Sequence, residues 1–131
     1  MKNSKPLKII LFISGLLLAI IGSSILFAPI GFSARNGIEL GENISLLNDT
    51  RAAGAGLMIS GIVILLGAFI QQLSFTSVII SIIAYLSYGF GRLISIAIDG
   101  APTEGLIKAT VVEMIIGLIS VFALYKFRIK K

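Results

Sequence analysis

Four apolar runs occupy most of the chain, and each is close to the length that an α-helix needs to cross a lipid bilayer. They cover residues 9–30, 52–70, 75–98 and 106–125, and about 20 residues of helix span roughly 30 Å of hydrocarbon. The chain is 56% hydrophobic and only 13% charged, whereas about a quarter of the residues of a soluble domain are charged. The pattern therefore predicts an all-α, integral membrane four-helix bundle that forms a single transmembrane domain over residues 1–131, with residues 31–51 as its long outer loop.

The distribution of charge predicts how this bundle lies in the membrane. Four spans place both termini on one side, and the basic residues on that side are Lys2, Lys5, Lys8, Lys126, Arg128, Lys130 and Lys131. No acidic residue lies there, and all six Asp and Glu residues fall toward the other side. Because basic flanks favour the cytoplasmic side, we expect both termini to be cytoplasmic. The first run is longer than the roughly 7–15 residues of a signal-peptide core, so we expect a retained helix.

Composition excludes several classes of function. The chain has no His and no Cys, which excludes metal sites built on imidazole or thiolate ligands, Cys nucleophiles and disulfides. The pattern implies no cofactor and no metal. The formal net charge is +5, but the basic residues flank apolar runs instead of forming the stripe that follows a phosphate backbone. We therefore expect the lipid bilayer, and not a nucleic acid, as the partner of this charge.

Two ionisable residues, Arg92 and Glu113, lie within the third and fourth runs. Arg92 precedes Pro102 by 10 residues and Glu113 follows it by 11, so in antiparallel helices with a rise of about 1.5 Å per residue they lie at similar depth. A charge at the bilayer centre costs about 2.5–3.5 kcal/mol on the insertion scale, and such residues are usually paired or functional. The sequence therefore predicts that the two side chains lie close together.

Polar residues recur at helical spacing in the third and fourth runs. Steps of three and four residues place one stripe on a single face of the third helix, and its members are Ser81, Tyr85, Tyr88, Arg92, Ser95 and Asp99. The fourth run carries a comparable stripe of small and polar residues at Ala109, Glu113, Gly117 and Ser120.

The second run has a stripe of small residues. Ala52, Gly56 and Ser60 recur every four residues, and such a small-xxx-small face predicts close approach of helix backbones. Asp49 or Thr50 precedes this run, and either is expected to cap the helix. The preceding loop mixes apolar residues with Glu and Asn, which is typical of a segment that lies on the outer interface or folds over the mouth of the bundle.

The polar residues of the spans have two interpretations. Arg92 and Glu113 can form an ion pair that only fixes the register of two helices, since buried pairs can specify a structure without chemistry. Alternatively, they belong to an outward-facing polar pocket, to which Arg51 adds a second guanidinium. Asp99 opposes the dipole at the end of its helix and needs a basic partner there. The predicted ligand-binding residues are Arg51, Tyr85, Tyr88, Arg92, Ser95, Asp99 and Glu113.

Three short segments of the chain resemble a known protein family. They are NDTRAAG at 48–54, GRLIS at 91–95 and DGAP at 99–102. They are similar to the small bacterial four-span proteins known as domain of unknown function 4345, in which an Arg-Ala pair opens the second helix and a Glu lies in the last. The resemblance covers nearly the whole chain and implies the same multi-pass fold in a bacterial inner membrane. It implies polar positions at Arg51, Arg92, Ser95, Asp99 and Glu113, and no particular activity.

Three functions from different classes are compatible with this pattern. The first is an accessory subunit or binding protein whose pocket holds a lipid or another small amphiphile. The second is a small proton-coupled transporter that acts as a dimer through Glu113, although a transport site is expected near the bilayer midplane and the inner halves of the runs carry no charge. The third is a membrane enzyme with Glu113 or Asp99 as general acid or base. A homo-oligomer or a larger membrane complex is compatible with all three.

Overall fold

The computed structural model describes residues 4–128, and helices make up most of this range. In chain order they are α1 (Lys5–Phe27), α2 (Pro29–Arg35), α3 (Ile44–Phe69), the 3-10 turn η1 (Gln71–Leu73), α4 (Ser74–Asp99) and α5 (Glu104–Phe127). No strand occurs between residues 4 and 128, and α1, α3, α4 and α5 are long and apolar enough to cross a membrane. The prediction of an all-α bundle with four spans is confirmed.

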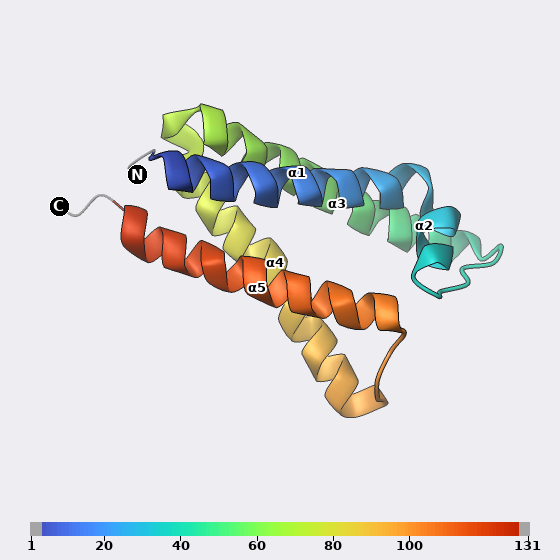
Figure 1. Cartoon of the computed structure of the whole chain (residues 1–131). Coiled ribbons are helices and arrows are strands. Elements are labelled where there is room, and N and C mark those ends of the chain that lie inside the picture. The colour runs from blue at the N-terminus through green and yellow to red at the C-terminus, as the bar shows by residue number, and fades with distance from the viewer. Residues whose placement is uncertain (1–3, 129–131) are drawn as a thin grey trace.

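The long helices form two antiparallel pairs (Figure 1). Helix α1 packs along α3, and α4 packs along α5. Helix α1 begins and α5 ends at the same end of the bundle, which we call the terminal end; the opposite end is the loop end. The two pairs are in contact near the terminal end, and α4 runs obliquely away from α3 toward the loop end, whereas the start of α5 stays near α2 (Figure 1).

Acidic residues are segregated to one of these two ends. Lys5, Lys8, Lys126 and Arg128 lie at the terminal end, whereas Lys2, Lys130 and Lys131 lie outside the described residues. The acidic residues other than Glu113, namely Glu39, Glu42, Asp49, Asp99 and Glu104, lie in the loops and helix ends at the loop end, where Arg35, Arg51 and Lys108 are also found. This segregation agrees with the charge pattern of the sequence, and the side of the membrane that each end faces stays a prediction.

Four glycines allow α1 and α3 to pack with their backbones in contact. A Cβ atom added to Gly15 would lie 2.5 Å from the backbone nitrogen of Leu65, and one added to Gly54 would lie 2.7 Å from that of Leu26. Gly22 and Gly61 complete the set, and each glycine is seven residues from the other one on its helix. The predicted packing face at Ala52, Gly56 and Ser60 is wrong, because α3 is rotated so that Ala52 and Gly56 are exposed and Ser60 is only half-buried.

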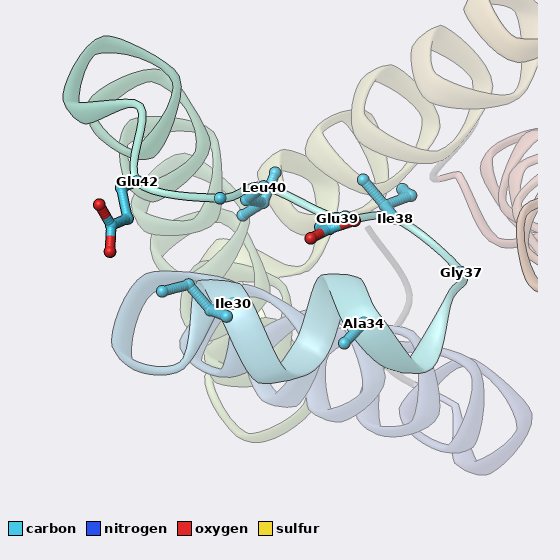
Figure 2. A pocket seen from close by; sticks show the side chains of 8 residues that line it. Ile30, Ala34, Gly37, Ile38, Glu39, Leu40 and Glu42 are labelled. Carbon is cyan, nitrogen blue, oxygen red and sulfur yellow. The ribbon is translucent and has the colours of Figure 1, made fainter.

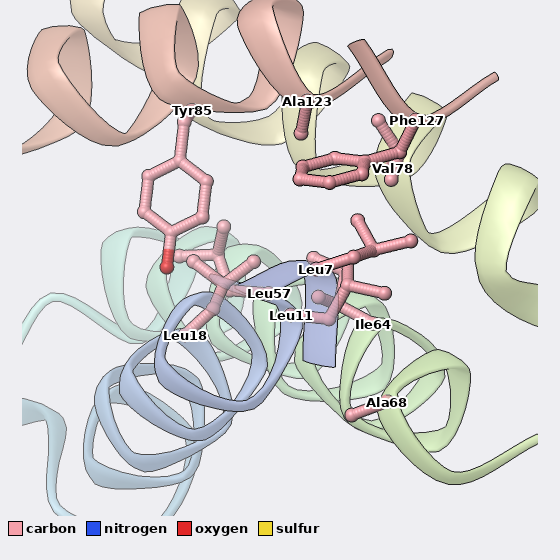
Figure 3. Close-up of a cluster of buried hydrophobic side chains, with 10 residues drawn as sticks. All are labelled: Leu7, Leu11, Leu18, Leu57, Ile64, Ala68, Val78, Tyr85, Ala123 and Phe127. Carbon is pink, nitrogen blue, oxygen red and sulfur yellow. The ribbon is translucent and has the colours of Figure 1, made fainter. Parts of the chain in front are cut away.

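Buried serines join the two helix pairs near the terminal end. Ser74 and Ser77 of α4 donate hydrogen bonds of 2.9 and 2.8 Å to the backbone carbonyls of Gly67 and Val63 in α3. These bonds matter because a hydroxyl that is buried without a partner is costly in apolar surroundings. The apolar core lies around the same level and includes Leu7, Leu11, Ile64, Ala68, Val78 and Phe127 (Figure 3). The terminal half of the bundle is therefore its closely packed part.

The long outer connection is largely helical. Helix α3 begins at Ile44, eight residues before the predicted start of its span, and the Asn43 side chain caps it by accepting a 3.1 Å hydrogen bond from the backbone N–H of Leu46. The prediction of Asp49 or Thr50 as the cap is wrong, because Thr50 lies inside the helix and donates to the carbonyl of Leu46. Pro29 lies in the first turn of α2, where a proline is well tolerated. Residues 36–43 are the non-helical part of the predicted loop 31–51.

A hydrogen bond ties this connection to the start of α5. The Thr103 hydroxyl donates to the backbone carbonyl of Asn36 over 2.6 Å. Gly37, next to Asn36, has a φ of +76° and lies against the Thr103 side chain, so a Cβ at this position would meet both steric and conformational strain. At the loop end, this hydrogen bond therefore connects the end of α2 to the start of α5.

Candidate functional site

Arg92 and Glu113 form an ion pair between α4 and α5. The Arg92 Nε donates hydrogen bonds to both carboxylate oxygens of Glu113, over 3.2 Å to Oε1 and 3.0 Å to Oε2. The side chains are 29% and 16% exposed, respectively, so the carboxylate is the more enclosed partner. The prediction that the two residues lie side by side is confirmed.

Close packing of α4 against α5 brings this pair together. Gly89 lies one turn from Arg92 and accommodates the Met114 side chain, while Gly117 lies one turn from Glu113 and accommodates Leu86. The Cα–Cβ bonds of a helix tilt toward its N-terminus, so the side chains of these antiparallel helices lean toward opposite ends of the bundle. The close approach of the helices at these glycines lets the two long side chains of Arg92 and Glu113 meet between them.

The Arg92 guanidinium also contacts an aromatic ring. Its Cζ atom lies 5.9 Å from the centre of the Tyr88 ring, within the range of a cation–π interaction. Both contacts with Glu113 use the Nε atom of Arg92. No residue between 4 and 128 accepts a hydrogen bond from the two terminal amino groups of Arg92. One edge of the guanidinium is thus bound to the carboxylate, and the other is available to a ligand.

The polar stripe of α4 divides into two parts with different surroundings. Tyr85 is 2% exposed and its hydroxyl donates to the backbone carbonyl of Ser14 in α1 (Figure 3). Ser81 is hydrogen bonded to Ser120 of α5 over 2.7 Å. These residues pack in the bundle interior, where α4 is still close to α1. Tyr88, by contrast, remains with Arg92 in the half of α4 that leaves the other helix pair.

The structure does not bring Arg51 to this cluster. Its Nη1 atom donates a 2.6 Å hydrogen bond to the carbonyl of Leu26, near the end of α1. Carbonyls in the last turn of a helix lack partners within that helix, and a positive charge there also interacts favourably with the helix dipole. Arg51 therefore stabilises the end of α1 within the α1–α3 pair.

Ser95 and Asp99 lie beyond Arg92 toward the loop end of α4. The Ser95 hydroxyl donates to Asp99 Oδ2 over 3.3 Å, and both residues are exposed. The expected basic partner of Asp99 is not found among residues 4–128, since Arg92 is bound to Glu113 and Arg51 to Leu26. Ser95 thus borders the cluster, and Asp99 marks its outer limit.

Two grooves run along one side of α4. The polar groove is a shallow, open depression of about 360 Å³, and its lining, which lies entirely on α4, is Ser87, Tyr88, Gly91, Arg92 and Ser95. The apolar groove lies between α3 and α4 and measures about 420 Å³. Its lining comes from Ala53, Gly56, Leu57 and Ser60 of α3 and from Ile80, Ile83, Ala84 and Tyr88 of α4. Tyr88 lines both grooves, so the two adjoin at this side chain, with the apolar groove on the side of the terminal end.

Two glycines leave the grooves open. A Cβ atom added to Gly56 or to Gly91 would have no neighbour within 4 Å, although both residues lie inside helices. Gly56 lines the apolar groove and Gly91 the polar one. Both glycines can be read in the sequence, where Gly91 directly precedes Arg92, but the sequence does not indicate their surroundings. Only the packing of the helices reveals that these two glycines have no role in helix contact.

A third hollow of about 410 Å³ lies at the loop end. It lies open between α2 and the extended segment that follows, with Ile30 and Ala34 on the helix and Ile38, Glu39, Leu40 and Glu42 on the segment (Figure 2). None of the predicted ligand-binding residues lines it. Its lining is apolar apart from two exposed glutamates, which agrees with a segment folded near the mouth of the bundle.

Comparison with known proteins identifies a family. A family model described as a domain of unknown function (DUF4345) matches residues 6–124, a range that includes most of each of the four long helices. This result confirms the resemblance noted in the sequence. No curated protein matches the chain, and no solved structure matches it.

Proposed function

We propose that this chain, which belongs to the family described as a domain of unknown function (DUF4345), binds a membrane lipid or a similar amphiphile in the two connected grooves beside α4. The charge pattern supports a placement in which both termini face the cytoplasm. The loop end, with Arg92, then lies in the outer leaflet. For a bacterial chain, the corresponding membrane is the inner membrane.

The observation that carries this proposal is the open space at Gly56 and Gly91. A glycine inside a helix costs about 1 kcal/mol relative to alanine. At Gly15, Gly22, Gly54 and Gly61 this cost is offset because any side chain would collide with a neighbouring backbone. Gly56 and Gly91 have no such protein neighbour, and each lines a groove. The space that they leave suits a group that is not part of the chain.

The order of polarity along the grooves matches that of an amphiphile. The apolar groove lies deeper along α4 and is lined mainly by Ile83, Ala84, Leu57 and other small or apolar residues. The polar groove follows toward the loop end and contains Arg92. An acyl chain that lies against Gly56 therefore places its polar group beside Arg92. Both grooves are on the side of the bundle, so a lipid can enter from the bilayer.

Filling the apolar groove tests the proposal. We expect Gly56→Leu to reduce the amount of lipid that co-purifies with the protein at least about tenfold, a change that corresponds to ~1.4 kcal/mol. The measurement is native mass spectrometry of protein purified in mild detergent. Gly31→Leu is the matched control, because Gly31 also has open space around it but lies on α2 and lines neither groove. Equal lipid retention by wild type and both variants would refute lipid binding in this groove.

The geometry of Glu113 favours this function over proton-coupled transport. Both of its oxygens accept from Arg92, and it lines neither groove. A carboxylate held in this way is suited to positioning the guanidinium. Proton-driven substrate uptake in proteoliposomes that disappears in Glu113→Gln would reverse this ranking.

A further inference from the structure

We infer that the bound amphiphile carries an oxyanion, either a phosphate or a carboxylate, and that this group binds the terminal amino groups of Arg92. The inference rests on the proposed function, because it concerns the polar end of a molecule whose tail lies in the apolar groove. It specifies the chemistry of the polar group, which the proposal of lipid binding leaves open.

The first argument is the way in which Arg92 is bound. A guanidinium has five N–H donors in a planar fork, and Glu113 engages only the Nε–H. The terminal amino groups have no hydrogen-bond acceptor among residues 4–128, yet Arg92 lines the polar groove. A fork of this kind matches the oxygens of phosphate and carboxylate groups. A ligand with such oxygens would complete the hydrogen bonding of Arg92.

The second argument is the charge and the hydrogen-bonding character of the groups that line the polar groove. Neither Glu113 nor Asp99 belongs to the lining, so Arg92 is the charged residue of this groove. The Tyr88 hydroxyl is a further donor with no acceptor in the described part of the chain. The hydroxyl hydrogens of Ser87 and Ser95 are already donated, to the carbonyl of Ile83 and to Asp99. The unused donors of this groove are thus the terminal amino groups of Arg92 and the Tyr88 hydroxyl, and these suit an oxyanion.

The third argument concerns the depth of Arg92 in the bundle and the role of Glu113 in holding it there. Arg92 precedes Asp99, the last residue of α4, by seven residues, which places its Cα about 10 Å below the end of the helix. The side chain leans toward the terminal end, toward Tyr88 and away from the loop end. Glu113 supplies the opposite charge that makes this depth tolerable in lipid. Glu113 is therefore a positioning residue for the guanidinium.

The test compares ligands with identical acyl chains and different polar groups. Purified protein, stripped of lipid, is titrated with phosphatidylglycerol, phosphatidylethanolamine or diacylglycerol and followed by native mass spectrometry. We expect both phospholipids to bind at least about tenfold more tightly than diacylglycerol, because hydrogen bonds to charged groups are strong enough for this ratio. Palmitate and hexadecanol form a second comparison, in which preference for palmitate shows that a carboxylate also suffices.

The results separate this inference from the proposed function. If diacylglycerol binds as tightly as phosphatidylglycerol and Gly56→Leu weakens both, the oxyanion inference fails and the groove remains a lipid site. If Gly56→Leu weakens no ligand, both proposals fail. Preference for phospholipid over diacylglycerol, together with weakening by Gly56→Leu, supports both.

Variants of the ion pair assign the preference to Arg92. The double variant Arg92→Met/Glu113→Met removes both charges, so no unpaired charge is left in the bundle. We expect it to bind diacylglycerol like wild type but to lose the preference for phosphatidylglycerol. Lys108→Met is the control, because Lys108 is a basic residue toward the loop end of α5 with a 74% exposed side chain. A folded double variant that keeps the wild-type preference would overturn the inference.

A second variant covers the case in which the double variant does not fold. Gly91→Leu fills the space beside Arg92, where an added Cβ atom meets no neighbour within 4 Å, and leucine has a higher helix propensity than glycine. We expect it to lose the preference for phosphatidylglycerol while Arg92 and Glu113 remain in place. Unchanged preference in Gly91→Leu would contradict binding of the polar group in this groove.

Discussion

The hydroxyl of Tyr85 donates a hydrogen bond to the backbone carbonyl oxygen of Ser14, and the bond joins the α4–α5 pair to the middle of α1. Tyr85 is 2% exposed, so its hydroxyl has no access to solvent. Tyr85 lies about one helical turn before Tyr88, which lines both grooves. The buried phenol therefore contributes to holding the pairs together at the level of the apolar groove, whose lining on α4 runs from Ile80 to Tyr88.

Replacing Tyr85 with Phe should destabilise the bundle by about 1 kcal/mol, the typical net contribution of a single hydrogen bond. The ring remains in place, so packing is preserved. The free energy of unfolding can be measured by titration with SDS in mixed micelles. Tyr125→Phe is the control, because Tyr125 is 67% exposed, and it should leave stability unchanged. A similar change in both variants would contradict a role for the Tyr85 hydroxyl.

The contact between α1 and α3 should not tolerate side chains at its glycines. A Cβ at Gly54 would lie 2.7 Å from the backbone nitrogen of Leu26, so the helices must move apart. We expect Gly54→Val to lower stability by about 1–3 kcal/mol, as overpacking does, or to prevent folding. Gly56→Ala, two residues away on the same helix, should be neutral or stabilising by up to about 1 kcal/mol. Equal loss of stability in both would show that this crossing is not glycine-dependent.

The Arg92–Glu113 pair should show strong coupling in a double-mutant cycle. Removing one partner of a buried ion pair costs up to about 3–5 kcal/mol, because it leaves a charge unpaired, whereas removing both is often nearly neutral. Arg92 is 29% exposed, so the lower part of this range is expected for the single variants. Arg92→Gln and Glu113→Gln should each be less stable than Arg92→Gln/Glu113→Gln. Additive effects would mean that the two side chains do not interact in the membrane.

The bond between Thr103 and Asn36 should control the mobility of the loop end. Thr103→Val removes the 2.6 Å hydrogen bond to the Asn36 carbonyl and keeps a side chain of similar shape. We expect faster hydrogen exchange in residues 36–43, as measured by mass spectrometry, with little change in the four long helices. Thr76→Val, at an exposed position of α4 near the terminal end, should leave this exchange unchanged. Unaltered exchange in Thr103→Val would show that other contacts hold the connection.

The orientation of the bundle can be tested with single cysteines, because the chain has none of its own. Glu42 and Gln72 are both exposed and lie in connections at opposite ends of the bundle. If the termini are cytoplasmic, a membrane-impermeant maleimide added to intact spheroplasts should label Glu42→Cys and not Gln72→Cys. The reverse pattern would place the polar groove in the inner leaflet.

Much of the fold follows from local properties of the sequence. The length and hydropathy of each apolar run predict a spanning helix without reference to its neighbours, and an even number of spans brings the termini to one end. The matched distances of Arg92 and Glu113 from Pro102 also predict their pairing, because helix rise is regular. The family resemblance agrees with the same features. These predictions depend on residues within one helix or one hairpin.

The rotation of each helix and the separation of the two pairs depend on packing between distant segments. Helix α3 has small residues on two faces, and only the matching glycines of α1 decide that Gly54, not Gly56, is in the contact. Tyr85 and Tyr88 are one turn apart on one stripe, yet the oblique course of α4 buries the first and leaves the second in the grooves. Arg51 is hydrogen bonded to a backbone carbonyl at the end of α1, and its charge alone does not predict this partner. The sequence thus determined the spans and the ion pair, while tertiary packing decided which side of α4 stays open.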